Sequence, residues 1–208
     1  MATPGRRLDI GAIFICDLQD KFRNAIWQFD KVVLTTQKVL KAAQILKIPV
    51  VVTTQNGAKL GGTVSELEPL LGNAIVTVDK TRFSMMVPEV EEVLDSATPQ
   101  SKVSKTAGAV VIVGIEAHIC VTQTTLDLLA SGRKVYVLAD AVSSCNAPEV
   151  PIALARLRAE GAVVTTSESW LYETMGDAAI PEFRDIARLV KETSADTKAA
   201  LSGLLSKI

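Results

Sequence analysis

The 208-residue chain has no long apolar run, no excess of one charge and no low-complexity tract. Its apolar runs are far shorter than the roughly 20 residues that a helix needs to cross a bilayer, so we expect a soluble protein without a membrane partner. Its 22 basic and 23 acidic side chains are spread along the chain, so no broad basic face is expected, which argues against nucleic acid as a partner. Because no tract rich in Gly, Ser or Pro divides the chain, we expect one domain over residues 1–208.

Cysteine is also scarce, and its three copies form no recognisable motif. Cys16, Cys120 and Cys145 are odd in number, and their spacing matches neither a disulfide framework nor a CxxC metal site. This usage indicates free thiols in a reducing compartment, and we expect a cytoplasmic protein. Arg6 and Arg7 precede the first apolar run without an apolar signal core, which leaves a mitochondrial location open.

Short apolar runs alternate with amphipathic segments along the chain. The runs that predict buried strands are residues 10–16, 50–54, 74–78, 109–114, 134–138 and 162–166. The segments that predict helices between them include residues 31–46, 88–94 and 148–160. This alternation predicts a three-layer, Rossmann-like α/β fold, in which a six-stranded parallel sheet of the common order 3-2-1-4-5-6 has helices on both faces.

Two segments outside this alternation are open to more than one interpretation. Thr63 and Glu66 have the spacing of a capping box, which predicts a short helix in the glycine-containing segment between the second and third strands. That segment is either a lid or a surface excursion. C-terminal helices are expected over residues 181–208, after a core of about residues 8–172. Four apolar residues recur there with helical spacing, and their face fits docking on the chain's own body or on a second subunit: Leu201, Leu204, Leu205 and Ile208.

Three chemically active side chains follow three of the predicted strands. Asp17 follows the first strand, Lys80 the third and Cys120 the fourth, where Cys120 also opens a predicted helix. In doubly wound sheets, ligands bind outside the carboxyl ends of the strands, near the point where the strand order reverses. If the first and fourth strands are neighbours, Asp17 and Cys120 flank that point, and the long side chain of Lys80 reaches them across the end of the second strand. Backbone N–H groups at a helix start favour negative charge, so we expect the pKa of Cys120 to lie below the roughly 8.5 of a free thiol.

These side chains suit nucleophilic attack on a carbonyl group. Asp17 would take the proton of the Cys120 thiol, the thiolate would attack the carbonyl carbon, and water would hydrolyse the thioester-like intermediate. The charge of Lys80 would stabilise the carboxylate and the thiolate, and backbone N–H groups of the turn 114–120 would hold the oxyanion. Taken singly, each residue also has a structural explanation, as a strand-end cap, a solvated lysine or a small buried side chain. Their occurrence at three strand ends favours a hydrolase that acts on a small molecule.

Further side chains close to Asp17 and Lys80 in the sequence are candidates for a substrate pocket. Gln19 would orient Asp17 or bind a substrate amide, although a strand-end polar residue explains it nearly as well. Phe22 and Phe83 would wall the cavity, and packing in the core accounts for both rings just as simply. The substrate is therefore expected to be partly apolar.

The remaining histidine and cysteines receive simpler interpretations. His118 is expected to bind the backbone of its turn or to line the pocket, rather than to act as the partner of Cys120, because Asp17 already supplies a base. Cys16 lies within the first strand and is expected in the core. Cys145 follows the fifth strand and is expected at the edge of the pocket, without a chemical role.

The segments DLQDKF, DKTRFSM and GIEAHICV, with LGGTVSEL between the first two, resemble the isochorismatase-like cysteine hydrolase superfamily. They are most similar to its isochorismatase domain-containing branch, which includes a kinetoplastid protein described as a mitochondrial-associated ribonuclease. The likeness extends over about residues 8–172. It implies that Cys120 is the nucleophile, Asp17 the base and Lys80 the charge partner. It also implies a homo-oligomer, with residues 201–208 as an added contact.

The resemblance further implies a non-proline cis peptide bond between Ile115 and Glu116. Such a bond would turn the N–H groups of Glu116 and Cys120 toward the oxyanion, and it is rare outside sites that constrain it strongly. Thr54 departs from the branch, which usually has Glu at this position.

Two other departures narrow the activity that the resemblance implies. The nicotinamidases of this superfamily bind a metal through an Asp and paired histidines, but this chain has one histidine, His118, so no metal and no other cofactor is expected. Members that act on isochorismate carry Gly where this chain has Cys120, so isochorismate is not the expected substrate. The implied activity is metal-independent hydrolysis of a C–N amide-type or related carbonyl bond in a small molecule. The alternatives are a catalytically retired binding or scaffold protein and a ribonuclease, of which the second is disfavoured by the single histidine and the lack of excess positive charge.

Overall fold

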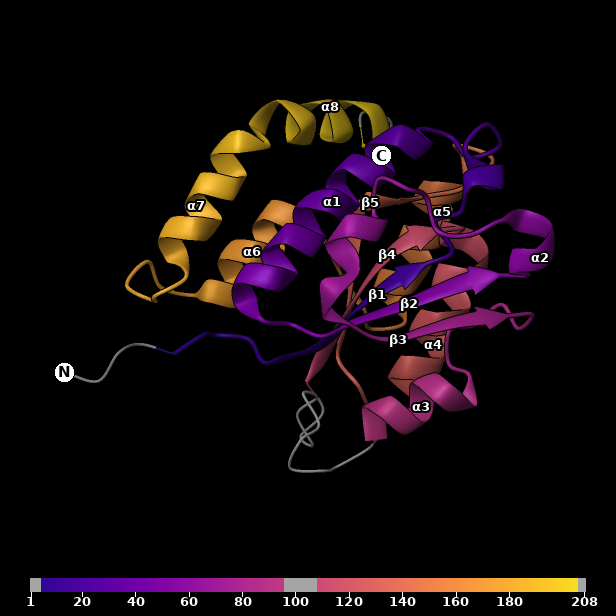
Figure 1. Ribbon diagram of the computed structural model, residues 1–208, viewed down its shortest axis with the longest axis horizontal. Coiled ribbons are helices and arrows are strands. Elements are labelled where there is room, and N and C mark those ends of the chain that lie inside the picture. The colour runs from indigo at the N-terminus through magenta and orange to yellow at the C-terminus, as the bar shows by residue number, and fades with distance from the viewer. Residues whose placement is uncertain (1–4, 96–107, 206–208) are drawn as a thin grey trace.

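The computed structural model describes residues 5–95 and 108–205, which form a six-stranded sheet covered by helices on both faces (Figure 1). Neighbouring strands are parallel, and their order is β3-β2-β1-β4-β5-β6. The strands are β1 (Ile10–Cys16), β2 (Val50–Gln55), β3 (Ala74–Lys80), β4 (Ala109–Ile115), β5 (Val135–Ser143) and β6 (Val163–Thr165). This arrangement confirms the predicted fold class and strand order, and it puts β1 beside β4 at the centre of the sheet.

Helices connect the strands and continue after the last of them. They are α1 (Phe29–Leu46), α2 (Gly57–Leu60), α3 (Pro88–Asp95), α4 (Thr122–Ala130), α5 (Glu149–Ala159), α6 (Ser167–Met175), α7 (Phe183–Glu192) and α8 (Ser194–Leu204). Short 3-10 turns lie at η1 (Asp20–Phe22) and η2 (Glu68–Asn73), and a π-helical turn lies at η3 (Ala117–Val121). None of the helices in the two described stretches combines the length and the hydropathy needed to cross a membrane.

Each face of the sheet has its own covering of helices. Helices α1, α6, α7 and α8 cover one face, and α3, α4 and α5 cover the other (Figure 1). We call the apolar cluster under α1, α6, α7 and α8 the first core and the cluster under α3, α4 and α5 the second core. Within β1, Ile13 and Ile15 belong to the first core, while Phe14 and Cys16 belong to the second, as the alternation of side chains along a strand requires. Because both faces of the sheet are covered, every residue of β1 and β4 is buried. This burial explains the near-continuous apolar runs in the sequence.

Strand β5 continues beyond the predicted residues 134–138 and ends at Ser143. Asp140 breaks the apolar pattern within this strand, but its carboxylate accepts hydrogen bonds from the backbone N–H and the hydroxyl group of Ser167, at 2.7 and 2.5 Å. A buried polar side chain is tolerated when its hydrogen bonds are satisfied. The longer strand pairs Ile115 of β4 with Ser143, so the segments that follow these two residues emerge side by side.

The prediction of a helix that begins with a capping box at Thr63 and Glu66 is wrong. Thr63 forms an isolated antiparallel bridge with Gln19, and Glu66 binds Arg23 with an N–O distance of 2.9 Å. The next helical turn begins only at Glu68. Contacts with residues far away in the sequence therefore replace the local cap, and they hold this segment against the chain that follows β1.

The apolar face of α8 docks on the chain's own body. Ala200 and Leu204 are fully buried in the first core, where α8 contacts α1. At the same contact, Nζ of Lys38 donates a hydrogen bond to Oγ1 of Thr197 at 2.9 Å. Leu204 is therefore used within the chain, and Ile208 lies outside the described residues. Homo-oligomer formation through residues 201–208 stays a prediction.

Candidate active site

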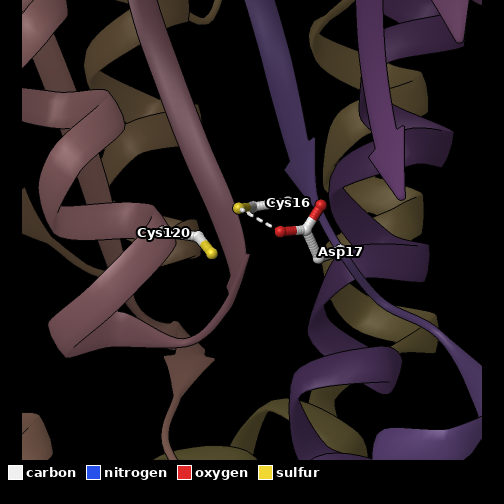
Figure 2. Close-up of side chains that lie close together, drawn as sticks. All are labelled: Cys16, Asp17 and Cys120. Carbon is white, nitrogen blue, oxygen red and sulfur yellow. Dashed lines mark hydrogen bonds between the residues drawn. The ribbon is translucent and has the colours of Figure 1, made fainter. Parts of the chain in front are cut away.

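Asp17 lies directly after β1, where the strand order reverses. Its backbone has a φ of +49°, in the left-handed region, so the regular strand ends there. The carboxylate is buried beside the side chain of Cys16, with Sγ of Cys16 3.6 Å from Oδ2 (Figure 2). The other carboxylate oxygen, Oδ1, accepts a hydrogen bond from Oγ1 of Thr53 at 2.8 Å. The end of β1 therefore presents a thiol and a carboxylate to the same interior space.

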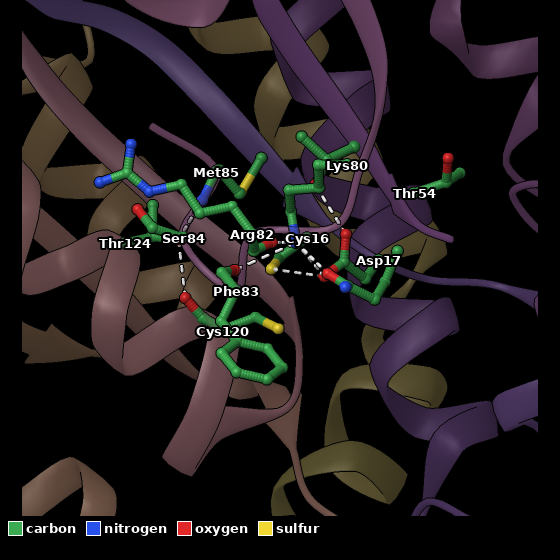
Figure 3. Close-up of polar contacts among 12 residues, drawn as sticks. Cys16, Asp17, Thr54, Lys80, Arg82, Phe83, Ser84, Met85, Cys120 and Thr124 are labelled. Carbon is green, nitrogen blue, oxygen red and sulfur yellow. Dashed lines mark hydrogen bonds and ion pairs between the residues drawn. The ribbon is translucent and has the colours of Figure 1, made fainter. Parts of the chain in front are cut away.

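Lys80, at the end of β3, forms a buried ion pair with Asp17. Its Nζ lies 2.8 Å from Oδ2 of Asp17. The same Nζ donates to three further oxygens, which are Oε1 of Gln55 at 2.8 Å and the carbonyl oxygens of Arg82 at 3.1 Å and Phe83 at 3.0 Å (Figure 3). A buried ion pair is stable only when such further hydrogen bonds compensate for lost hydration. This network holds the carboxylate in one position.

Cys120 lies in η3, the turn that connects β4 with α4, and only 7% of its surface is exposed. Its Sγ, the Sγ of Cys16 and a carboxylate oxygen of Asp17 all lie within 4.8 Å of one another (Figure 2). We call Cys16, Asp17 and Cys120 the inner group. π-Helical turns are frequent at functional sites. The fold thus brings together the residues that the sequence predicts at the strand ends. Cys120 lies close to Asp17, and Lys80 binds the carboxylate of Asp17.

The close approach of β4 to β1 depends on Gly114. Its φ is +113°, and a Cβ atom built there would lie 2.1 Å from the carbonyl oxygen of Cys16. Any larger residue would force the two strands apart, so glycine at this position lets η3 follow close to the end of β1. The peptide bond between Ile115 and Glu116 is cis.

Cys16 is the member of the inner group that the sequence does not single out. The sequence predicts it in the core, where it is fully buried, but its Sγ is also close to Asp17 and Cys120. Burial raises the pKa of Cys16 well above its usual value, and a hydrogen bond with Cys120 and the charge of Asp17 raise it further. Cys16 is therefore a neutral thiol at neutral pH. The one sequence feature that could have placed Cys16 in this group is its adjacency to Asp17. Alternation along a strand predicts instead that adjacent side chains point to opposite faces, so Cys16 is not expected beside the Asp17 carboxylate.

Comparison with known proteins places this geometry in a family. A model described as the isochorismatase domain matches residues 11–169 of the chain. The chain belongs to the isochorismatase family. The secreted isochorismatase effector Isc1 of Phytophthora sojae is 44% identical to this family member over 182 residues, which cover 86% of this chain and 84% of that protein. The isochorismatase domain-containing protein 2 of Homo sapiens is 41% identical over 193 residues, which cover 93% of this chain and 86% of that protein.

Solved structures agree with this assignment. The structure of MAR1 ribonuclease from Caenorhabditis elegans matches with a TM-score of 0.80 and 38% identity, and the match covers 91% of this chain and 93% of that chain. The YcaC product of Escherichia coli, described as an octameric hydrolase of unknown specificity, matches with a TM-score of 0.69 over 99% of this chain and 92% of that chain. Because its identity is only 17%, this second match supports the fold alone. Membership of the isochorismatase family supports a hydrolase.

In this isochorismatase-family protein, the amide of Gln19 is fully buried and bound to backbone groups. Its Nε2 donates to the carbonyl oxygens of Gln55 at 3.1 Å and Gly61 at 2.6 Å, and its Oε1 accepts a hydrogen bond from the N–H of Gln55 at 2.7 Å. Gln19 therefore joins the end of β1 to the segment after β2.

The two phenylalanines that the sequence assigns to the pocket have different surroundings. Phe22 is partly buried and packs against the first core, so its ring has a structural role. The ring of Phe83 is different, because 51% of this residue is exposed while its carbonyl oxygen binds Lys80. Of the two, Phe83 is the ring that is free to contact a ligand beside the inner group.

Thr54, at the position where the resemblance implies Glu, binds a neighbouring strand. Its Oγ1 donates to Oδ1 of Asp79 at 2.9 Å, and the same oxygen accepts the N–H of Gly57 at 2.7 Å. The bond from Gly57, followed by that from Thr54, lowers the pKa of Asp79. Thr54 thus helps to hold the end of β3, which carries Lys80.

His118 belongs to a second group, which we call the outer group and which consists of Glu116, His118 and Cys145. Nδ1 of His118 lies 2.9 Å from Oγ of Ser144, and Oε2 of Glu116 accepts the N–H of Cys145 at 2.7 Å. Hydrogen bonding to Glu116 is the main cause that raises the pKa of Cys145, and burial adds to it. Within residues 5–95 and 108–205, the inner and outer groups are the two clusters whose donor atoms are arranged closely enough to hold a metal ion.

Proposed function

We propose that this protein is a cysteine hydrolase that cleaves a C–N amide-type or related carbonyl bond in a small molecule without the help of a metal ion. The observation that carries the proposal is the position of the Asp17 carboxylate, which is 2.8 Å from Nζ of Lys80 and within 4.8 Å of the Cys120 thiol. A nucleophile beside a base, with the base oriented by a third group, is the general arrangement that activates cysteine and serine.

The proposed reaction has two stages. Asp17 accepts the proton of Cys120 while Sγ forms a bond to the carbonyl carbon of the substrate, and Lys80 holds the carboxylate in place. The tetrahedral intermediate then collapses, the C–N bond breaks, and the leaving amine takes the proton from Asp17. In the second stage Asp17 accepts a proton from water, the resulting hydroxide attacks the thioester, and the thiolate of Cys120 leaves and regains that proton.

Backbone N–H groups are proposed to hold the negative oxygen of both tetrahedral intermediates. The N–H groups of Glu116 and Cys120 belong to the turn that positions the nucleophile, and donors aimed at the developing charge supply much of the rate enhancement in such sites. Because Cys120 is only 7% exposed, it suits a small substrate better than a polymer. The exposed ring of Phe83 supports a substrate with an apolar part.

A screen of small amides and related carbonyl compounds with intact-protein mass spectrometry tests this proposal. We expect a substrate to produce an acyl adduct that peptide mapping places on Cys120, rather than on Cys16 or Cys145. The Cys120→Ser variant should form no thioester and should lose at least about 10⁴-fold in turnover, because the nucleophile and its base act as a unit.

Two outcomes would contradict the proposal. Turnover at the rate of the unaltered chain in purified Cys120→Ser would exclude the Cys120 thiol as the nucleophile. A Cys120 thiol that alkylates with the pH midpoint of a free thiol, and at the same rate in a Lys80→Ala variant, would favour a binding or scaffold protein instead.

A ribonuclease is a second candidate because the chain is 38% identical to the structure described as MAR1 ribonuclease over 91% of its length. The burial of Cys120 and the balanced charge give this activity little physical support. RNA cleavage that is lost in Cys120→Ser would establish it at this site, whereas cleavage that persists in the variant would point to a contaminating nuclease. A homo-oligomer is also proposed, because the resemblance to the isochorismatase-like superfamily implies one.

A further inference from the structure

The outer group lies where two neighbouring strands end. Glu116 directly follows β4 and His118 lies in η3, while Cys145 comes two residues after Ser143, the end of β5. Because Ile115 and Ser143 are paired across the two strands, the residues that follow them emerge beside each other. The strand register therefore explains why side chains 27 to 29 positions apart meet, as in the bond from the N–H of Cys145 to Glu116.

The three side chains offer three different ligand atoms. A carboxylate oxygen, an imidazole nitrogen and a sulfur atom lie within 4.8 Å of one another. Zn²⁺ binds these ligand types at about 2.0–2.3 Å in a tetrahedral arrangement, which requires ligand atoms roughly 3.3–3.8 Å apart. Side-chain movements of about 1 Å would reach that geometry. The set also differs from a cluster of surface carboxylates, because sulfur and imidazole favour zinc over magnesium or calcium.

Hydrogen bonds already orient two of these ligands. Nδ1 of His118 lies 2.9 Å from Oγ of Ser144, and this contact orients the ring, so Nε2 would be the nitrogen that binds the ion. The bond from the N–H of Cys145 to Oε2 of Glu116 leaves the second carboxylate oxygen of Glu116. Metal-binding histidines commonly have their other ring nitrogen held in this way. Cys145 is exposed, so the fourth position of a tetrahedral ion would face solvent.

We propose that Glu116, His118 and Cys145 form a binding site for one Zn²⁺ ion, separate from the inner group. The sequence predicts no metal because it lacks the paired histidines of nicotinamidases, but the outer group combines a single histidine with a carboxylate and a thiol. A bound ion would connect η3, which carries Cys120, to the segment after β5. It would stabilise the folded state without entering the hydrolytic reaction, because a ligand that binds only the folded protein shifts the unfolding equilibrium.

The test starts with the full chain after removal of metal ions by a chelator. Titration with Zn²⁺ in a calorimeter should show one bound ion, and Co²⁺ should give the absorption of a thiolate-bound, tetrahedral ion. We expect Cys145→Ser and His118→Gln to weaken Zn²⁺ binding by at least about 100-fold, because loss of a direct ligand should exceed the 10-fold to 100-fold effect of outer hydrogen-bond partners. Thermal melts of the zinc-free variants show whether each one is folded.

The Cys120→Ser variant is the matched control, because it removes a thiol from the inner group and leaves the outer group intact. It should bind Zn²⁺ as the unaltered chain does. Binding that is lost in Cys120→Ser and kept in Cys145→Ser would place the ion in the inner group and overturn the proposal. The absence of Zn²⁺ binding by the unaltered chain at micromolar concentrations would overturn it as well.

Discussion

The inner and outer groups contain a carboxylate beside a thiol at the same edge of the sheet, but they differ in burial. All members of the inner group are buried, whereas Glu116 and His118 are half-buried and Cys145 is exposed. The difference appears in the causes of the raised thiol pKa values. Burial is the largest cause for Cys16, and the hydrogen bond to Glu116 is the largest for Cys145.

This contrast shows what burial adds to a pair of similar side chains. Charges in a low-dielectric interior interact strongly and must be paired, as Lys80 is with Asp17. At the surface, water and salt screen the same charges, so a carboxylate and a thiol influence each other weakly. Substitutions in and around the inner group should therefore have large effects on stability, and those in the outer group small ones.

The largest expected effect follows from Lys80→Met. Removal of the ammonium group leaves the Asp17 carboxylate buried without its partner, which destabilises proteins by about 3–5 kcal/mol. Hydrolysis should also fall by about 10²–10⁴-fold, because the proposed base loses the group that orients it. Urea denaturation measures the first effect, and steady-state kinetics on a substrate from the amide screen measures the second.

Two further variants separate this ion pair from a general loss of lysine. Lys41→Met changes an exposed lysine of α1 and should alter the free energy of unfolding by less than about 0.5 kcal/mol. The double variant Asp17→Asn with Lys80→Met removes both charges and should recover part of the lost stability. Equal stability losses in Lys80→Met and Lys41→Met would show that burial does not distinguish the ion pair.

The sequence predicts the meeting of Asp17, Lys80 and Cys120 better than it predicts the outer group, for a physical reason. Asp17, Lys80 and Cys120 follow strands whose apolar runs are plain, and parallel strands bring their carboxyl ends to one edge. The left-handed turn at Asp17 has no such signal, so the proximity of Cys16 to Cys120 could not be predicted.

The outer group depends on pairing that local patterns do not show. It requires the register between β4 and β5, and β5 runs on past Asp140, where the apolar pattern breaks. The prediction of a capping box at Thr63 and Glu66 is wrong for a related reason, because Glu66 binds Arg23, which lies far away in the sequence. Local patterns predict elements and their ends, whereas long-range pairing decides which of the residues beyond those ends meet.

A smaller effect is expected from the thiol of Cys16 at alkaline pH. Its pKa is raised in the folded state, so the unfolded chain loses this proton first as pH rises. The stability that it contributes is complete below the unfolded pKa of roughly 8.5 and is lost as pH rises toward the folded pKa. This group should lower the free energy of unfolding by up to about 1.4 kcal/mol per pH unit above that value. Urea denaturation of Cys16→Ala over the same pH range, under reducing conditions, should show a shallower decline, and an unchanged decline would contradict the assignment.

The smallest effect is expected from Cys145→Ala in zinc-free protein, which is the matched surface substitution. The pKa of Cys145 is raised mainly by its hydrogen bond with Glu116. Both the thiol and the Glu116 carboxylate are accessible to solvent, so screening reduces the contribution of their interaction to stability. We expect the free energy of unfolding at neutral pH to change by less than about 0.5 kcal/mol, and its alkaline decline to stay close to that of the unaltered chain. If Cys145→Ala changed the alkaline decline in the free energy of unfolding as much as Cys16→Ala does, then proximity to a carboxylate, rather than burial, would control the pKa of both thiols. With Zn²⁺ present, the unaltered chain should gain stability and Cys145→Ala should not, because the ion would give the outer group the strong pairing that burial gives the inner one.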